Sequence, residues 1–119
     1  MKKMKFIIVA CLILALPAIS FANKSDIKVL KKIKHLEKTP GLSWIKVDRE
    51  NIIIGWAGMP QDFNEVNLKA AVEANIERGH KVVVWSVRHK QTGYIVGTRP
   101  YLCKTTAKNG RIYKSTCNY

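Results

Sequence analysis

Apolar and polar positions are grouped along this chain, and the most clearly bounded apolar run covers residues 82–87. It holds four valines and one tryptophan in six residues, with polar residues 80–81 before it and 88–90 after it. β-Branched and aromatic side chains suit a pleated, packed surface, and a short unbroken apolar run is typical of a strand buried on both faces. We therefore expect residues 82–87 to form the central strand of the fold.

A first helix is predicted over residues 25–38. Ser25 is a favourable N-cap residue, and Pro40-Gly41 ends the segment. At 100° per residue the apolar positions form one arc and most lysines gather opposite it, which predicts a surface helix docked by its apolar side. A membrane-binding helix has the same pattern, so that alternative stays open.

A second helix is predicted over residues 63–78. Asp62 is its expected N-cap, with Glu65 three residues later as in a capping box, and Gly79 is a typical residue to follow a helix. One group of its apolar positions is rich in alanine, which favours close packing on a sheet. The other group, which includes Ile76, is expected to meet the first helix.

Residues 42–47 and 51–57 are predicted to form a hairpin across the turn at 48–51. With the turn centred on Arg49-Glu50, Trp44 lies opposite Gly55. An aromatic side chain that covers a strand glycine fills the space left by the missing side chain. We therefore favour a structural role for Trp44 over a role in stacking on a ligand.

Three further strands are expected beyond the central one, over residues 94–99, 102–106 and 111–116. Asn109-Gly110 between the last two is a strong hairpin signal, whereas Pro100 confines the first of them to an edge. The order helix, hairpin, helix and four strands predicts an α+β fold: a single antiparallel sheet with two helices packed on one face.

The N-terminus has the pattern of a signal peptide over residues 1–22. A positive start, an apolar run and small residues before position 23 predict cleavage after Ala22. A lipoprotein site at Cys11 is the alternative, but too few apolar residues precede that cysteine. Residues 23–119 then form one α+β domain that is secreted or periplasmic.

Cys103 and Cys117 are the only cysteines in residues 23–119, and an exported domain permits their oxidation. We expect a disulfide that staples the last hairpin; a closed loop of about 15 residues is worth about 3 kcal/mol in the chain-entropy model. A regular two-residue turn would place Cys103 opposite Thr116, so that the two sulfurs would not meet. A bulge, or a bridge just beyond the last paired residues, would reconcile the two signals.

The charge is strongly positive and unevenly distributed. The whole chain has a formal charge of +13, and all eight acidic residues lie between Asp26 and Glu77. Residues 78–119 contain nine Lys or Arg and no acid. A region of one sign concentrates anionic partners around it, although a generally basic exported protein would have the same composition.

Few catalytic or metal-binding arrangements are visible. His80 and His89 bracket one strand, about 30 Å apart at 3.3 Å per residue, so they cannot share one active site. A hydrolase of nuclease type would need His35 with a carboxylate or a second histidine. No metal-ligand spacing, serine-hydrolase motif or phosphate loop occurs, so we expect no cofactor and no metal, and an enzyme is the less favoured class.

The remaining signal is a surface on which tyrosines alternate with cations. Such mixtures bind polyanions through stacking and charge. The function predicted is that of a small exported basic binding protein for an anionic polymer or an acidic protein surface. The alternatives are the nuclease-type hydrolase and an inhibitor or accessory subunit of another exported protein. The residues expected in the binding surface are Arg88, Lys90, Tyr94, Arg99, Tyr101, Lys104, Arg111, Tyr113 and Lys114.

Overall fold

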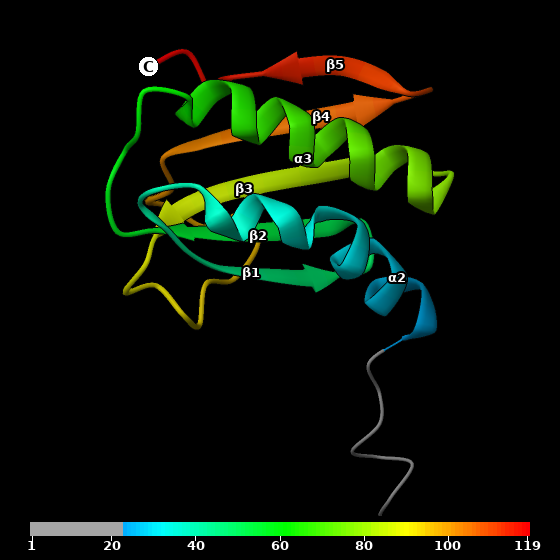
Figure 1. Cartoon of the computed structure of the whole chain (residues 1–119), viewed down its shortest axis with the longest axis horizontal. Helices are drawn as coiled ribbons and strands as arrows, with labels where there is room; N and C mark the ends of the chain where they lie inside the picture. Colours follow the sequence, from blue (N-terminus) through cyan, green and yellow to red (C-terminus); the bar gives the residue numbers. More distant parts are fainter. Residues whose placement is uncertain (1–22) are drawn as a thin grey trace, which may run out of the picture.

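The computed structural model describes residues 23–119; the signal peptide expected over residues 1–22, with Cys11, lies outside this part (Figure 1). Within these residues, two α-helices, one 3₁₀ helix and five strands follow one another in this order: α2 (Lys24–Ile33), η1 (Lys34–Lys38), β1 (Leu42–Asp48), β2 (Asn51–Trp56), α3 (Phe63–Arg78), β3 (Val82–Arg88), β4 (Cys103–Lys108) and β5 (Arg111–Ser115).

The five strands form one sheet in the order β1-β2-β3-β4-β5. The α+β class is confirmed, but the expectation of a purely antiparallel sheet was wrong at one pair, because β2 and β3 are parallel. The reason is α3, which carries the chain back to the starting end of β2 before β3 begins, as in a β-α-β crossover. The other three neighbouring pairs are antiparallel.

β3 lies at the centre of the sheet, and its burial on both faces confirms the interpretation of the valine run. Val82 and Val84 face the helices and are fully buried. Val83, Trp85 and Val87 face the other side and belong to a second apolar cluster. An element buried on both faces needs covering layers on both sides, and the chain provides them with its helices on one side and a loop on the other.

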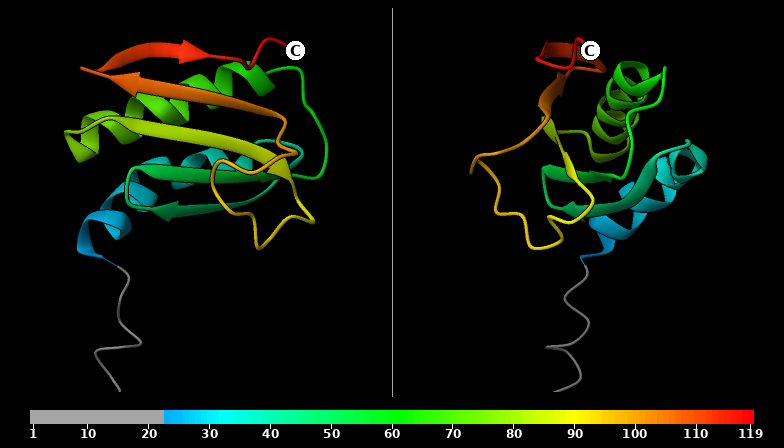
Figure 2. Two further views of the ribbon diagram at one scale, coloured as in Figure 1. Left: turned by 180° about the vertical axis from the view of Figure 1, so that it is seen from behind. Right: turned by 90° about the vertical axis from the view of Figure 1, so that its left-hand side faces the viewer.

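Both helices cover the same face of the sheet, as predicted (Figure 2). In α3 the fully buried alanines Ala70, Ala71 and Ala74 allow close approach to the sheet. α3 also packs against α2, as expected for its other apolar group, but Ile76 of that group is an exception, since it is 62% exposed.

The helix ends were only partly predicted. Asp62 occupies the N-cap position of α3 but makes no capping bond with its side chain, and Gly79 ends the helix with a left-handed φ of 81°. The N-cap of the first helix lies two residues earlier than expected, because Asn23 rather than Ser25 holds this position and accepts a hydrogen bond from the Ser25 amide. Its last residues form η1 instead of an α-helical turn.

Residues 89–102 form a loop over the sheet face opposite the helices (Figure 2). The strand expected at 94–99 does not exist. Tyr94 and Val96 pack on the second apolar cluster while Ile95 points outward, so the alternation typical of a strand is present without ladder bonds. Gly97, with φ 88°, and short-range bonds such as that from the Thr98 amide to the Ile95 carbonyl bend this segment instead.

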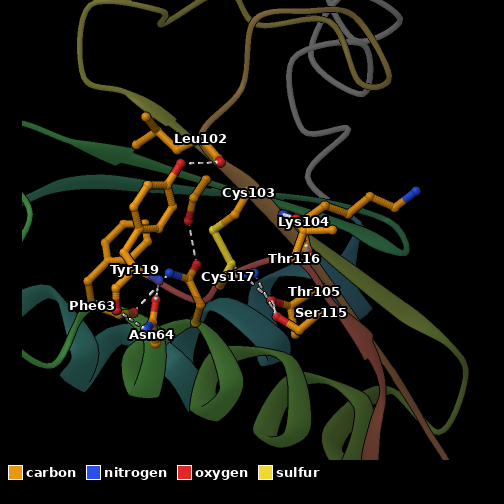
Figure 3. Close-up of a disulfide and its surroundings, with 12 residues drawn as sticks. Phe63, Asn64, Leu102, Cys103, Lys104, Thr105, Ser115, Thr116, Cys117 and Tyr119 are labelled. Carbon is orange, nitrogen blue, oxygen red and sulfur yellow. Dashed lines mark hydrogen bonds between the residues drawn. A yellow bond between two sulfur atoms is a disulfide. The ribbon is translucent and has the colours of Figure 1, made fainter.

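The disulfide between Cys103 and Cys117 is present, with a Cα–Cα distance of 5.0 Å (Figure 3). The predicted conflict of register is resolved by a bulge. Lys108 pairs with Arg111, but beyond Ala107 the pairing shifts and Thr106 lies opposite Lys114. The one extra residue in β5 changes the register so that Cys117 rather than Thr116 reaches Cys103.

Candidate functional site

A cationic surface is built on β4 and β5, on the side of the sheet that faces away from the helices. Cys103 and Ala107 point into the core under the helices, so the alternate positions of β4 point to the opposite side. The register then places side chains of β5 beside them. We call this surface the hairpin face and define it by Lys104, Lys108, Arg111, Tyr113 and Lys114.

The cations of the hairpin face lie close to one another. Lys108 is the direct cross-strand partner of Arg111, and Lys114 lies opposite Thr106, two positions along the ladder. Directly opposite residues have Cβ atoms about 4.5–5.5 Å apart, where like charges destabilise a sheet. The arrangement therefore carries an electrostatic cost that a bound anion would offset.

Carboxylates are placed elsewhere in the molecule. Within residues 23–119 the ion pairs are His35–Glu73, Arg49–Asp48 and Arg78–Asp26, and none includes a cation of β4 or β5. The pair between Arg78 and Asp26 is largely buried and joins α2 to the end of α3. The acidic residues that form ion pairs therefore lie on the helices and at the turn between β1 and β2.

Two lysines of the hairpin face rest on aromatic rings. The Lys104 Nζ lies 4.9 Å from the centroid of Trp85, and the Lys108 Nζ lies 3.9 Å from that of Tyr113. Contacts of a cation with a ring face are worth roughly 0.5–1 kcal/mol at exposed sites and orient the ammonium group. Tyr113 is itself 65% exposed, so its ring is accessible to a ligand on this surface.

Tyr94 and Tyr101 were predicted to bind ligand, but the structure places them in the loop packing. The Tyr101 ring meets Trp85 edge-on at 5.2 Å, and Tyr94 lies 6.2 Å from the same indole. The Tyr94 hydroxyl donates a hydrogen bond to the Thr98 carbonyl. Burial raises the pKa of this hydroxyl above its usual 10.0.

Three other predicted cations lie outside β4 and β5. Arg88 pairs with Trp56, whose side chain is in the core under the helices, so Arg88 points to the helix side of the sheet. Lys90 is the second residue after β3, and Arg99 is exposed; both belong to the loop of residues 89–102. The structure therefore brings together four of the nine predicted residues, namely Lys104, Arg111, Tyr113 and Lys114, on one surface.

Lys108 is a member of the hairpin face that the sequence interpretation missed. The signal was available, because Lys104, Thr106 and Lys108 alternate along a strand that ends at the Asn109-Gly110 turn. An i, i+2, i+4 pattern places all three side chains on one face.

His35 lies beside a carboxylate, as the hydrolase alternative requires. Its Nε2 is 2.8 Å from the Glu73 Oε1, and this contact joins η1 to α3. The His35 side chain is 51% exposed. Among the described residues, those that line the surface depressions around it include lysines, acids and apolar residues but no Ser, Cys or second His. His80 and His89 lie at opposite ends of β3, far from one another.

Residues 23–119 contain neither a cluster of metal ligands nor a membrane-spanning helix. No three or more His, Cys, Asp or Glu side chains of residues 23–119 come close enough together to hold a metal ion. No helix in this part of the chain has the length and apolar character needed to cross a bilayer.

Comparisons with known proteins leave the geometry as the only guide to function: no family model, no curated protein and no solved structure matches this chain.

Proposed function

We propose that this chain is an exported binding protein whose hairpin face binds an anionic polymer. The observation that carries the proposal is the direct pairing of Lys108 with Arg111, flanked by Lys104 and Lys114, while no ion pair among residues 23–119 includes a cation of β4 or β5. An anion between the strands would replace repulsion by attraction. Export is supported by the pattern of residues 1–22 and is consistent with the disulfide.

The shape of the hairpin face favours an extended ligand. Lys104 and Lys108 are four residues apart on one strand, a span of about 13 Å at 3.3 Å per residue. Several charges spaced along a line are matched best by a polymer with repeated anionic groups, such as single-stranded nucleic acid or a sulfated polysaccharide. The exposed ring of Tyr113 offers one stacking position within the row.

Charge-matched variants test the proposal. In one, Arg111→Gln and Lys114→Gln remove two exposed cations from the hairpin face; in the other, Lys31→Gln and Lys32→Gln remove two exposed cations from α2. Fluorescence anisotropy with labelled heparin or an oligothymidylate should show a clear loss of affinity for the first variant and little loss for the second. Equal losses would mean that binding follows total charge, and the proposal would be wrong.

A nuclease-type hydrolase is the second candidate, and the contact between His35 and Glu73 is the observation that favours it. A carboxylate on one ring nitrogen would orient the imidazole as a general base. Hydrolysis of a phosphodiester that is lost in His35→Gln would support this function. Absence of turnover in the unchanged protein would eliminate it.

A further inference from the structure

The parallel strands β2 and β3 end at the same edge of the sheet, and the chain leaves them toward opposite faces. From β2 it passes through residues 57–62 to α3 on the helix side. From β3 it enters the loop of residues 89–102 on the other side (Figure 2). Two neighbouring parallel strands whose connections diverge in this way leave a crevice beyond their carboxyl ends, where ligands of open α/β sheets bind.

A cavity of about 460 Å³ lies at this position. Trp56, Met59 and Leu102 supply apolar surface, whereas Arg88, His89 and Lys90 supply nitrogen donors, two of them permanently charged. No Asp or Glu lines the cavity. Its volume falls in the range of small-molecule sites, about 300–1,000 Å³, and is far too small for a protein domain.

Hydrogen bonds to backbone groups hold one wall of the crevice in place. The His89 amide donates to the Trp56 carbonyl at 2.8 Å, and the Trp44 indole N–H donates to the His89 carbonyl, also at 2.8 Å. Gln91 accepts from the Arg88 amide at 3.0 Å and donates to the Pro100 carbonyl at 3.0 Å. Trp44, which we expected to have a structural role, thus also fixes the segment that carries the cations.

The other wall is held by a close approach of two glycines. The Gly41 carbonyl accepts the amides of Ala57 and Gly58 at 2.7 and 3.3 Å. A Cβ atom on Gly41 would lie 2.5 Å from the Gly58 carbonyl oxygen, so a larger residue would displace this wall. Both walls are therefore formed before any ligand arrives, which lowers the entropic cost of binding.

We infer that this crevice binds a small molecule that carries an anionic group next to an apolar ring, such as an aryl phosphate or aryl carboxylate. Arg88 and Lys90 receive the anionic group, and Met59 and Leu102 contact the ring. Arg88 offers the planar donor pair that matches a phosphate or carboxylate. The site is separate from the hairpin face, since Arg88 points to the helix side of the sheet, and it does not depend on polymer binding.

Phenyl phosphate is a suitable probe, with inorganic phosphate and phenol as its two halves. Titration of the ¹⁵N-labelled protein should shift the amides of Gly58 and of residues 88–91 together with the Trp56 indole signal. Phenyl phosphate should bind at least about tenfold more tightly than either half, because the anionic and apolar contacts add. No saturable shift at millimolar phenyl phosphate, or equal affinity for inorganic phosphate, would overturn the inference.

Two single variants locate the site. Arg88→Gln should weaken phenyl phosphate binding about tenfold, the equivalent of one charge-assisted hydrogen bond. Arg99→Gln removes an exposed arginine of the loop of residues 89–102 that does not line the crevice, and it should leave the affinity unchanged. A well-dispersed spectrum of each variant establishes that it is folded. Equal effects of the two variants, or shifts confined to residues 104–114, would contradict the assignment.

Discussion

At the scale of single residues, one extra residue in β5 determines how the C-terminal hairpin is closed. The bulge moves Cys117 into register with Cys103 and leaves Lys114 opposite Thr106. Beside the disulfide, the Thr105 hydroxyl lies within hydrogen-bond distance of both the Ser115 hydroxyl and the Cys117 sulfur (Figure 3). The same bulge therefore positions the covalent link and a cation of the hairpin face.

Removal of the disulfide should destabilise the protein substantially. The double variant Cys103→Ser with Cys117→Ser should lose about 2–5 kcal/mol of unfolding free energy, because the unfolded chain regains the freedom of the closed loop. Urea unfolding of the variant, compared with the unchanged protein with and without reductant, measures this loss. Intact mass before and after alkylation is the control, and two free thiols in the protein purified without reductant would contradict the bridge.

Some residue roles were predictable and others were not. Trp44 was assigned to cover Gly55, and a Cβ atom at Gly55 would indeed overlap the Trp44 ring. The buried chain of Trp56, Ser86 and Asn67 was missed: the indole donates to the Ser86 hydroxyl, which donates to the Asn67 side chain. A cross-strand pair can be predicted from the register of one hairpin. The network joins two strands and a helix, so the register of one hairpin does not predict it.

At the scale of elements, β3 is the part of the fold on which both covering layers depend. Its fully buried Val84 lies between Ile52 of β2 and Thr105 of β4. Every layer of the structure contacts this strand or its two neighbours, so damage at this position cannot be confined to one face.

Val84→Asp should prevent folding, because it buries a carboxylate without a partner in the apolar core. Lys81→Asp, an exposed change just before the same strand, is the control and should fold. Circular dichroism distinguishes the two outcomes. In the unchanged protein, the amides of residues 82–87 should exchange with deuterium more slowly than those near Asn109; the reverse order would show that β3 is not the stable centre.

The elements that were predicted correctly are those specified by local signals. Asn109-Gly110 fixes the last hairpin with φ values of 53° and 78°, and Gly79 ends α3. The parallel pairing of β2 with β3 was missed because it depends on the path of α3 across the sheet. The loop of residues 89–102 was taken for a strand because Tyr94 and Val96 bury alternate side chains without a ladder partner.

At the scale of the whole molecule, the two faces of the sheet differ in charge. The acids lie on the helices, on the first hairpin turn and just before α3, together with many of the lysines, so the helix side has mixed signs. The hairpin face is on the other side and bears cations only. β4 and β5 lie together at one edge of the sheet. The charge imbalance of the sequence therefore gives the molecule one positively charged side.

The salt dependence of binding tests the proposed polyanion site most directly. If the four cations of the hairpin face neutralise four phosphates of an oligothymidylate, the logarithm of the binding constant should fall against the logarithm of salt concentration with a slope of about −3. The variant with Arg111→Gln and Lys114→Gln should have a slope smaller in magnitude by about 1.4, because two contacts are lost. A slope near zero, which is expected for an interface dominated by apolar contacts with another protein, or an unchanged slope in the variant, would contradict the account.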